Sequence, residues 1–183
     1  MSSGLPWLVA IDMQEIFGRP DSQWFTPEYE RASAGIQRLL PAFGEHAIFT
    51  RFVAPAEPQG AWVPYYEQWS FALVPDDDPL YALTAPFAGA APHVETRPTF
   101  GKWDAELAGA MGGSSEMVLT GVSTDCCVIS TALAAADAGV HVRVVADACA
   151  GLSADDHRRA LDAMALYAPL IEITTVDEVL ASI

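Results

Sequence analysis

Short apolar runs alternate with amphipathic stretches along the chain. Residues 7–11 (WLVAI) form a continuous apolar run, as expected of a strand buried on both faces of a parallel sheet. Between residues 27 and 43 the apolar positions recur with helical spacing, and Pro27 suits a first helical turn. The same patterns predict further strands at 47–50, 94–96, 117–120, 140–146 and 170–174, and further helices at 104–111, 125–138, 154–167 and 176–183. This alternation of strand and helix predicts an α/β fold with a mainly parallel sheet.

Residues 52–92 interrupt the alternation. They are rich in proline and aromatic residues and show no clear period, which predicts a long loop, and loops of this length are often functional. No Gly/Ser linker, long charge run or repeat divides the chain. We therefore expect a single domain over residues 1–183, with 52–92 as a lid or inserted loop region.

The composition narrows the range of partners. Acidic residues outnumber basic ones by 24 to 9, which gives a formal net charge of −15. A surface this acidic repels phosphate backbones and anionic lipid, so neither nucleic acid nor a membrane is an expected partner. The chain shows neither an export signal nor the roughly 20 apolar residues of a membrane span, which predicts a cytoplasmic protein. Its three cysteines, Cys126, Cys127 and Cys149, are expected to be free thiols.

Two chemically active residue types follow predicted strands. Asp12 ends the first strand, and Cys127 lies where the 117–120 strand leads into its helix. Ligands of open parallel sheets bind beyond the carboxyl ends of the strands. A thiol in the first turn of a helix is close to unpaired N–H groups that favour the thiolate. The alternatives are a cysteine that only fills the core and an aspartate that only caps a turn.

Four segments in order carry a resemblance to a known family. They are residues 8–14 (LVAIDMQ), 100–102 (FGK), 121–128 (GVSTDCCV) and 144–151 (VVADACAG). Together they resemble the isochorismatase-like cysteine hydrolase superfamily, which includes nicotinamidases, N-carbamoylsarcosine amidohydrolase and biuret hydrolase. The resemblance covers nearly the whole chain and implies a three-layer α/β/α, doubly wound fold around a six-stranded sheet.

The resemblance also implies catalytic roles. Cys127 holds the nucleophile position, and Cys126 the variable position beside it. Asp12 is expected to accept the thiol proton and return it to the leaving amine. Lys102, the only lysine of the chain, is expected to hold both groups in register, although by itself it would be interpreted as a surface charge. The peptide before Ser123 matches one that is cis in the family, where the N–H groups of Ser123 and Cys127 would form an oxyanion hole.

The same comparison suggests a reaction without a metal or other cofactor. The four histidines are scattered, and residues 50–55 (TRFVAP) lack the histidine that metal-dependent nicotinamidases carry there. The expected substrate is a small amide, ureide or carbamoyl compound. Aromatic residues are expected to line its pocket: Phe17, Trp62, Trp69 and Trp103. Arg51 and Arg97 are candidates to bind a substrate carboxylate or, alternatively, structural partners of the surplus acids.

Other functions remain open from the sequence. They are a non-catalytic binding or scaffold protein with the same fold, a hydrolase of vinyl ethers such as isochorismate, and a thiol redox protein that uses Cys126 and Cys127. Members of the superfamily are commonly dimers or tetramers, so a homo-dimer or homo-tetramer is expected.

Overall fold

The computed structural model describes residues 4–183. Its central sheet has six strands, all parallel, in the order β3-β2-β1-β4-β5-β6. The strands are β1 (Trp7–Ile11), β2 (Ala47–Phe52), β3 (His93–Arg97), β4 (Glu116–Val122), β5 (His141–Ala150) and β6 (Ile171–Thr174). The strand order reverses direction between β1 and β4, which is the place where doubly wound sheets bind their ligands. The predicted α/β class and parallel sheet are confirmed.

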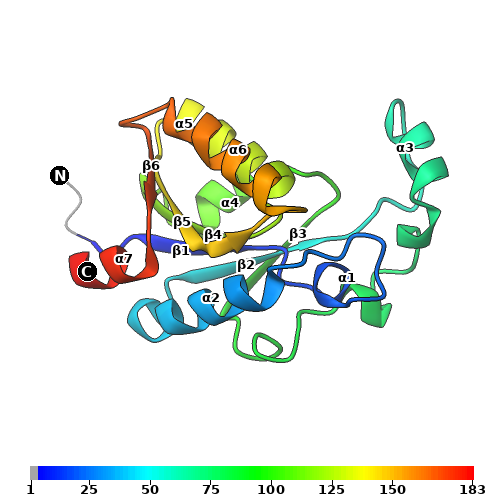
Figure 1. The fold of residues 1–183 in the computed structure, drawn as a ribbon, viewed down its shortest axis with the longest axis horizontal. Coiled ribbons are helices and arrows are strands. Elements are labelled where there is room, and N and C mark those ends of the chain that lie inside the picture. The colour runs from blue at the N-terminus through cyan, green and yellow to red at the C-terminus, as the bar shows by residue number, and fades with distance from the viewer. Residues whose placement is uncertain (1–3) are drawn as a thin grey trace.

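Helices cover both faces of the sheet (Figure 1). They are α1 (Glu15–Gly18), α2 (Tyr29–Phe43), α3 (Trp62–Gln68), α4 (Ala105–Ala110), α5 (Ile129–Asp137), α6 (Ala154–Ala165) and α7 (Val176–Ser182). On β1, Leu8 and Ala10 face the core beneath α2 and α7, whereas Val9 and Ile11 face the core beneath α4, α5 and α6. Both faces of β1 are thus buried, as its continuous apolar run predicts.

The contact between β1 and β4 requires a glycine at position 121. Gly121 has φ +105°, a region that favours glycine, and a Cβ at this position would lie 2.2 Å from the carbonyl oxygen of Ile11. The two strands therefore run side by side up to their carboxyl ends. This places the residues that follow them, Asp12 and Ser123, at the same edge of the sheet.

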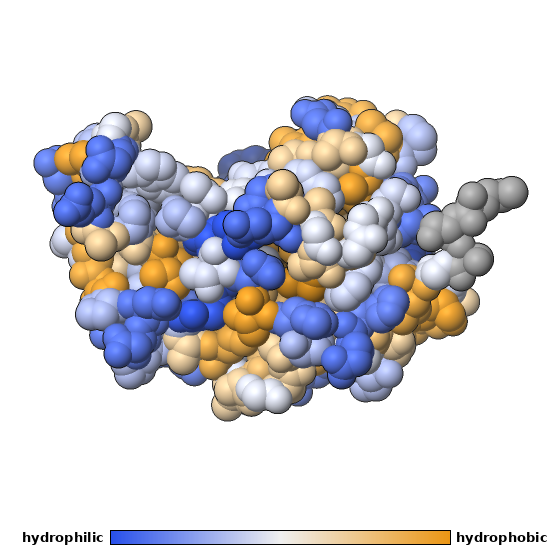
Figure 2. Space-filling model, turned by 180° about the vertical axis from the view of Figure 1, so that it is seen from behind, coloured by the Kyte–Doolittle hydropathy of each residue, from blue (hydrophilic) through white to orange (hydrophobic). Residues whose placement is uncertain are grey.

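The segment between β2 and β3 is more regular than predicted. It contains α3 and two 3-10 helices, Ser70–Ala72 and Pro79–Tyr81, where the sequence predicts only a loop. Its helices are too short, and its prolines and aromatic residues too frequent, for the apolar positions to show a helical period. The α3 region projects from the body, and the surface is hollowed between this projection and the α5 and α6 side (Figures 1 and 2).

The amide side chain of Gln14 fastens this segment to the sheet. Its Nε2 donates to the carbonyl oxygens of Phe52, at 2.9 Å, and Tyr81, at 2.8 Å, and its Oε1 accepts from Phe52 N–H at 2.7 Å. Gln14 is fully buried, so all these bonds are shielded from water. The Gln14 side chain thus joins the end of β2 to the 3-10 helix that ends at Tyr81.

The end of β5 also differs from prediction. The β5 strand continues to Ala150 rather than ending at residue 146, because Cys149 and Ala150 pair with Gly121 and Val122 after a shift in register. The polar Asp147 suggests a turn in the sequence, but its carboxylate accepts the N–H of Val176 at the start of α7.

Within residues 4–183, no helix is both long and apolar enough to cross a membrane.

Candidate active site

The carboxylate of Asp12 is fixed by the neighbouring strand. Asp12 has φ +50°, an uncommon conformation for a residue other than glycine. Its N–H donates to Thr50 Oγ1 at 3.1 Å, and the Thr50 hydroxyl donates to Asp12 Oδ1 at 2.7 Å. Thr50 was not singled out from the sequence, although a polar residue at the carboxyl end of an apolar strand is a usable signal.

Lys102 is buried and forms an ion pair with Asp12. Its Nζ lies 3.0 Å from Asp12 Oδ2, and neither side chain is exposed to solvent. The ammonium group also donates to the carbonyl oxygen of Thr99 at 2.6 Å and lies 5.2 Å from the centre of the Phe52 ring. A buried lysine needs such partners, so the interpretation as a surface charge is wrong.

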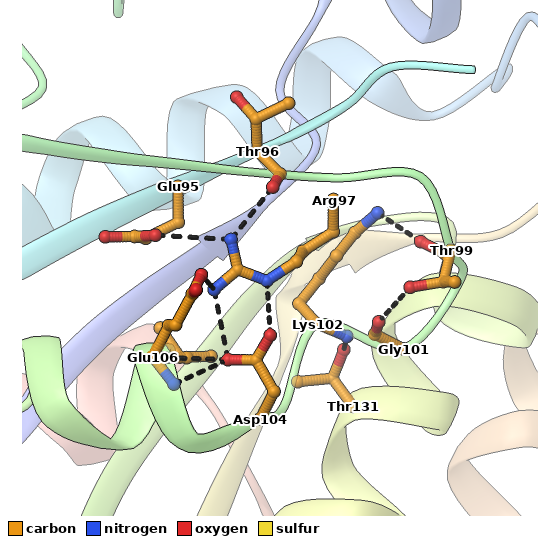
Figure 3. A network of polar contacts seen from close by, with 10 residues as sticks. Glu95, Thr96, Arg97, Thr99, Gly101, Lys102, Asp104, Glu106 and Thr131 are labelled. Carbon is orange, nitrogen blue, oxygen red and sulfur yellow. Dashed lines mark hydrogen bonds and ion pairs between the residues drawn. The ribbon is translucent and has the colours of Figure 1, made fainter. Parts of the chain in front are cut away.

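A polar network holds the loop that carries Lys102 (Figure 3). Arg97, at the end of β3, contacts the Asp104 carboxylate through Nε at 2.5 Å and Nη2 at 3.0 Å, and also pairs with Glu95 and Glu106. The Asp104 carboxylate in turn accepts the first N–H groups of α4, as an N-cap does. The Arg97 guanidinium holds the pKa of Asp104 below its usual value, so this carboxylate stays charged at neutral pH.

A second connection joins the Lys102 loop to the cysteine segment. The N–H of Lys102 donates to Thr131 Oγ1 at 3.0 Å, and the Thr131 hydroxyl donates to the carbonyl oxygen of Cys127 at 2.7 Å. Thr131 lies on α5 and is fully buried. The backbones of the predicted nucleophile and of Lys102 are therefore held together by one side chain.

Cys127 lies in a π-helical turn, Thr124–Val128, that precedes α5. The sequence predicts a continuous helix there, and π-turns often occur at functional sites. Val128 N–H donates to the carbonyl oxygen of Ser123 at 3.1 Å, five residues back. A 2.8 Å hydrogen bond between Thr124 Oγ1 and His157 Nδ1 ties the turn to α6.

The environment of Cys127 favours the thiol. Burial raises the pKa of the Cys127 thiol well above its usual range, the Asp12 carboxylate raises it further, and the Lys102 ammonium lowers it. The sequence-based expectation of a thiolate stabilised by the helix start neglects this burial, which is nearly complete. Because the Asp12 carboxylate acts on the pKa of this thiol, a candidate proton acceptor lies close to it.

The other two cysteines lack such a setting. Cys126 is half-buried, and its Sγ lies 3.8 Å from Asp125 Oδ2; burial and this carboxylate raise the pKa of its thiol. Cys149 is buried on β5, where its Sγ is 3.9 Å from the Leu119 carbonyl oxygen, and burial raises the pKa of its thiol to about 12. All three thiols are free.

The peptide bond between Val122 and Ser123 is cis. Ser123 is buried and lies at the floor of a pocket together with Cys126 and Cys127. The carbonyl oxygen of Ser123 accepts N–H groups from Cys126 and Val128. The assignment of the Ser123 and Cys127 N–H groups to an oxyanion hole stays a prediction.

A pocket opens above Cys127. Its lining consists of Phe17, Gln23, Trp24, Thr26, Phe52, Tyr65, Trp69, Phe100, Ser123, Cys126, Cys127 and Leu152. Of the four aromatics predicted to line it, Phe17 and Trp69 do so.

Trp62 and Trp103 are not in the lining, which corrects their assignment. Trp62 lies behind the pocket wall, 5.2 Å from the Tyr65 ring and 5.3 Å from the Phe100 ring between centres. Trp103 packs against the core on the other side of the sheet. The sequence shows that these residues are aromatic but not the direction in which each side chain points. The α3 helix and the Lys102 loop are too short or irregular for a repeating pattern of apolar positions to reveal it.

Two arginines considered for substrate binding have other partners. Arg51 donates to the carbonyl oxygen of Tyr81 and pairs with Asp76 at 2.7 Å, and Arg97 belongs to the network around Asp104. Neither lines the pocket. Among residues 4–183, no three His, Cys, Asp or Glu side chains are grouped as metal ligands.

The fold and the site define a doubly wound α/β protein with a buried carboxylate–ammonium pair beneath a cysteine at the sheet's switch point. The Isochorismatase domain family matches residues 6–178, so the chain belongs to this family. No match was found among the curated proteins.

Solved structures have the same fold. A cysteine hydrolase from Pseudomonas syringae pv. phaseolicola 1448A superposes with a TM-score of 0.84 at 19% identity, covering 99% of this chain and 97% of that one. N-carbamoylsarcosine amidase from Thermoplasma acidophilum gives 0.74 at 17% identity, over 95% and 98% of the two chains. The pyrazinamidase/nicotinamidase from Streptococcus mutans UA159 gives 0.71 at 21% identity, over 91% and 98%.

Proposed function

We propose that the protein is a cysteine hydrolase that cleaves a C–N bond of a small amide, ureide or carbamoyl compound. The observation that carries the proposal is the buried Asp12–Lys102 ion pair close to the Cys127 thiol. Cys127 itself lines the floor of a pocket. A nucleophile, an adjacent base and a group that orients the base are the parts that acyl transfer requires. The names of the structural neighbours, which include two amidases, are consistent with this chemistry.

In the first half of the proposed reaction, Asp12 accepts the thiol proton as Cys127 Sγ bonds to the substrate's carbonyl carbon. The raised pKa of Cys127 makes this transfer necessary, because little thiolate exists beforehand at neutral pH. The oxyanion that forms is bound by the N–H groups of Ser123 and Cys127. The C–N bond then breaks, the nitrogen takes the proton from Asp12, and an acyl or carbamoyl thioester remains on Cys127.

In the second half, water attacks the thioester carbon and Asp12 accepts a proton from it. The C–S bond breaks, the sulfur regains a proton, and the carboxylic or carbamic acid leaves. Lys102 keeps Asp12 in position through both halves. We propose that no metal takes part, because Thr50 and Arg51 occupy the end of β2 and Thr50 already binds Asp12.

The test is ammonia release from a panel of primary amides and ureides. We expect wild-type protein to hydrolyse at least one of them, Cys127→Ala to lose about 10³-fold or more of the rate, and Cys126→Ala to keep most of it. Acid quenching during turnover followed by mass spectrometry should find the acyl group on the peptide that contains Cys127.

Full activity in Cys127→Ala would exclude Cys127 as the nucleophile. Activity that a chelator abolishes and zinc restores would contradict the metal-independent mechanism. Equal loss in Cys126→Ala and Cys127→Ala, with reversible oxidation of the pair, would favour the redox alternative.

A further inference from the structure

The wall of the pocket carries no charged side chain. Above the floor formed by Ser123 and the two cysteines, it consists of aromatic rings and Leu152, with Gln23 and Thr26 as uncharged polar members. The two buried charges that act on Cys127, those of Asp12 and Lys102, compensate each other and are fully shielded from solvent. A charged substrate group in this wall would lose its hydration without gaining a partner.

The cations around the pocket are already bound to acids. Arg51 pairs with Asp76, and Arg97 pairs with Asp104, Glu95 and Glu106. The carboxylate of Asp125, next to the floor, accepts the N–H of Leu152 at 3.1 Å. An anionic substrate therefore meets an acidic neighbour and no available arginine, on a chain whose formal net charge is −15.

The wall is also preformed. Trp24 lies at its centre, and its ring contacts Phe52 at 5.6 Å, Trp69 at 6.1 Å and Phe71 at 5.1 Å between centres, each nearly edge to face. Rings from three separate segments thus hold one another in place, in a geometry that aromatic pairs prefer. The shape of the apolar space is set before a ligand enters.

The size of this space limits the substrate. The cavity volume is about 160 Å³. For comparison, an engineered apolar cavity of about 150 Å³ binds benzene. The wall therefore accommodates one ring or one branched aliphatic group, with the amide directed to the floor.

We propose, resting on the proposed function, that the substrates are uncharged amides with a compact apolar acyl group, and that the pocket rejects both anionic and cationic analogues of the same size. The aromatic wall selects by desolvation, because it offers apolar contact and no counter-charge. Aromatic rings also attract cations, so the cationic analogue is the more stringent comparison.

Three amides of similar size test this proposal. They are 3,3-dimethylbutanamide, which is neutral, its isosteric cation trimethylglycinamide, and the anion succinamate. Binding to full-length Cys127→Ala is measured by calorimetry, so hydrolysis does not interfere. We expect the neutral amide to bind roughly 100-fold more tightly than either charged one. Equal or tighter binding of either charged amide, or no binding of the neutral one, would overturn the proposal.

A pair of lysine substitutions provides the internal control. Leu152 lines the pocket and is 49% exposed, so Cys127→Ala with Leu152→Lys places an ammonium at the rim without burying it. We expect this variant to bind succinamate at least about tenfold more tightly than Cys127→Ala alone. Leu166, 85% exposed and outside the lining, gives the matched control, in which Leu166→Lys leaves succinamate binding unchanged. Equal effects of the two lysines would show that the overall charge, not the pocket wall, selects the ligand.

The two proposals fail in different ways. If the neutral amide binds selectively but wild-type protein releases ammonia from no amide, the pocket assignment stands and the hydrolase proposal fails. If wild-type protein hydrolyses charged and neutral amides equally well, the hydrolase proposal stands and the assignment of the substrate class fails.

Discussion

At the scale of single residues, the central feature is a pair of opposite charges without access to water. Asp12 and Lys102 lie 3.0 Å apart and are both completely buried. Removing two charges from water is costly, and a pair of this kind is weak evidence for added stability. Because the pair lies close to the Cys127 thiol, we propose instead that it serves the proton transfer of the reaction.

The substitution Asp12→Asn tests this interpretation. It leaves the Lys102 ammonium buried without its counter-charge, so we expect a loss of about 3–5 kcal/mol in the free energy of unfolding. It also removes the proton acceptor, so kcat should fall by about 10²–10⁴-fold. Urea unfolding and initial rates measure the two effects separately.

The double substitution Asp12→Asn with Lys102→Met is the control. It removes both charges and keeps the volume similar, so most of the lost stability should return while activity stays low. If the double variant is no more stable than Asp12→Asn alone, the loss does not come from an unpaired buried charge.

At the scale of elements, the loop between β3 and α4 determines where Lys102 lies. The Arg97–Asp104 ion pair joins its two ends, and a second connection runs from Lys102 through Thr131 to the backbone of Cys127. The Arg97 side chain is 12% exposed, so its contacts with three acids are partly shielded from solvent. The network in Figure 3 therefore positions the ammonium group without touching the substrate pocket.

Accordingly, Arg97→Gln should lower kcat by about tenfold or more and change KM much less, because it displaces Lys102 rather than the pocket wall. Arg97→Lys should recover part of the rate. The matched control is Arg158→Gln on α6, whose pair with Asp155 is exposed on both sides and should contribute little. Equal rates for Arg97→Gln and wild type would show that the loop holds its shape without the network.

At the scale of the whole molecule, charge of one sign dominates. The chain has 24 acidic and 9 basic residues. On the side of the molecule that Figure 2 shows, hydrophilic residues surround separate apolar patches. Like charges at these densities repel, and the repulsion opposes the compact state. Salt shortens the range of this repulsion, from about 30 Å at 0.01 M to about 3 Å at 1 M.

We therefore expect Tm to rise as NaCl increases from 0.01 M to about 0.5 M. The variant Glu45→Lys with Glu57→Lys, at two exposed positions, changes the net charge from −15 to −11, two units at each site. It should be more stable at low salt and respond less to added NaCl. A Tm that falls with salt would mean that the surface ion pairs outweigh the general repulsion.

The sequence contains strong signals for secondary structure that depends on residues close together in the chain. Most strands appear as apolar runs, and all six were located, with the boundaries of β1 correct to the residue. Where the repeating pattern of apolar positions covers only a few residues or is absent, the prediction fails. This happens at α3, in the π-turn of Cys127 and at the end of β5. Asp12 and Cys127 were proposed as site residues because both follow strands, and the edge of a parallel sheet brings such positions together.

What the sequence by itself determined is the α/β fold and the family, because these depend on patterns within short segments; the same patterns supplied the proposal for the catalytic residues. Only the tertiary structure decided that Lys102 is buried against Asp12, that Thr50 holds the carboxylate, and that burial raises the pKa of the Cys127 thiol. It also decided that Phe17 and Trp69 line the pocket whereas Trp62 and Trp103 do not. The physical reason is that burial and direction depend on segments far apart in the chain, which meet only after the crossover connections have placed them.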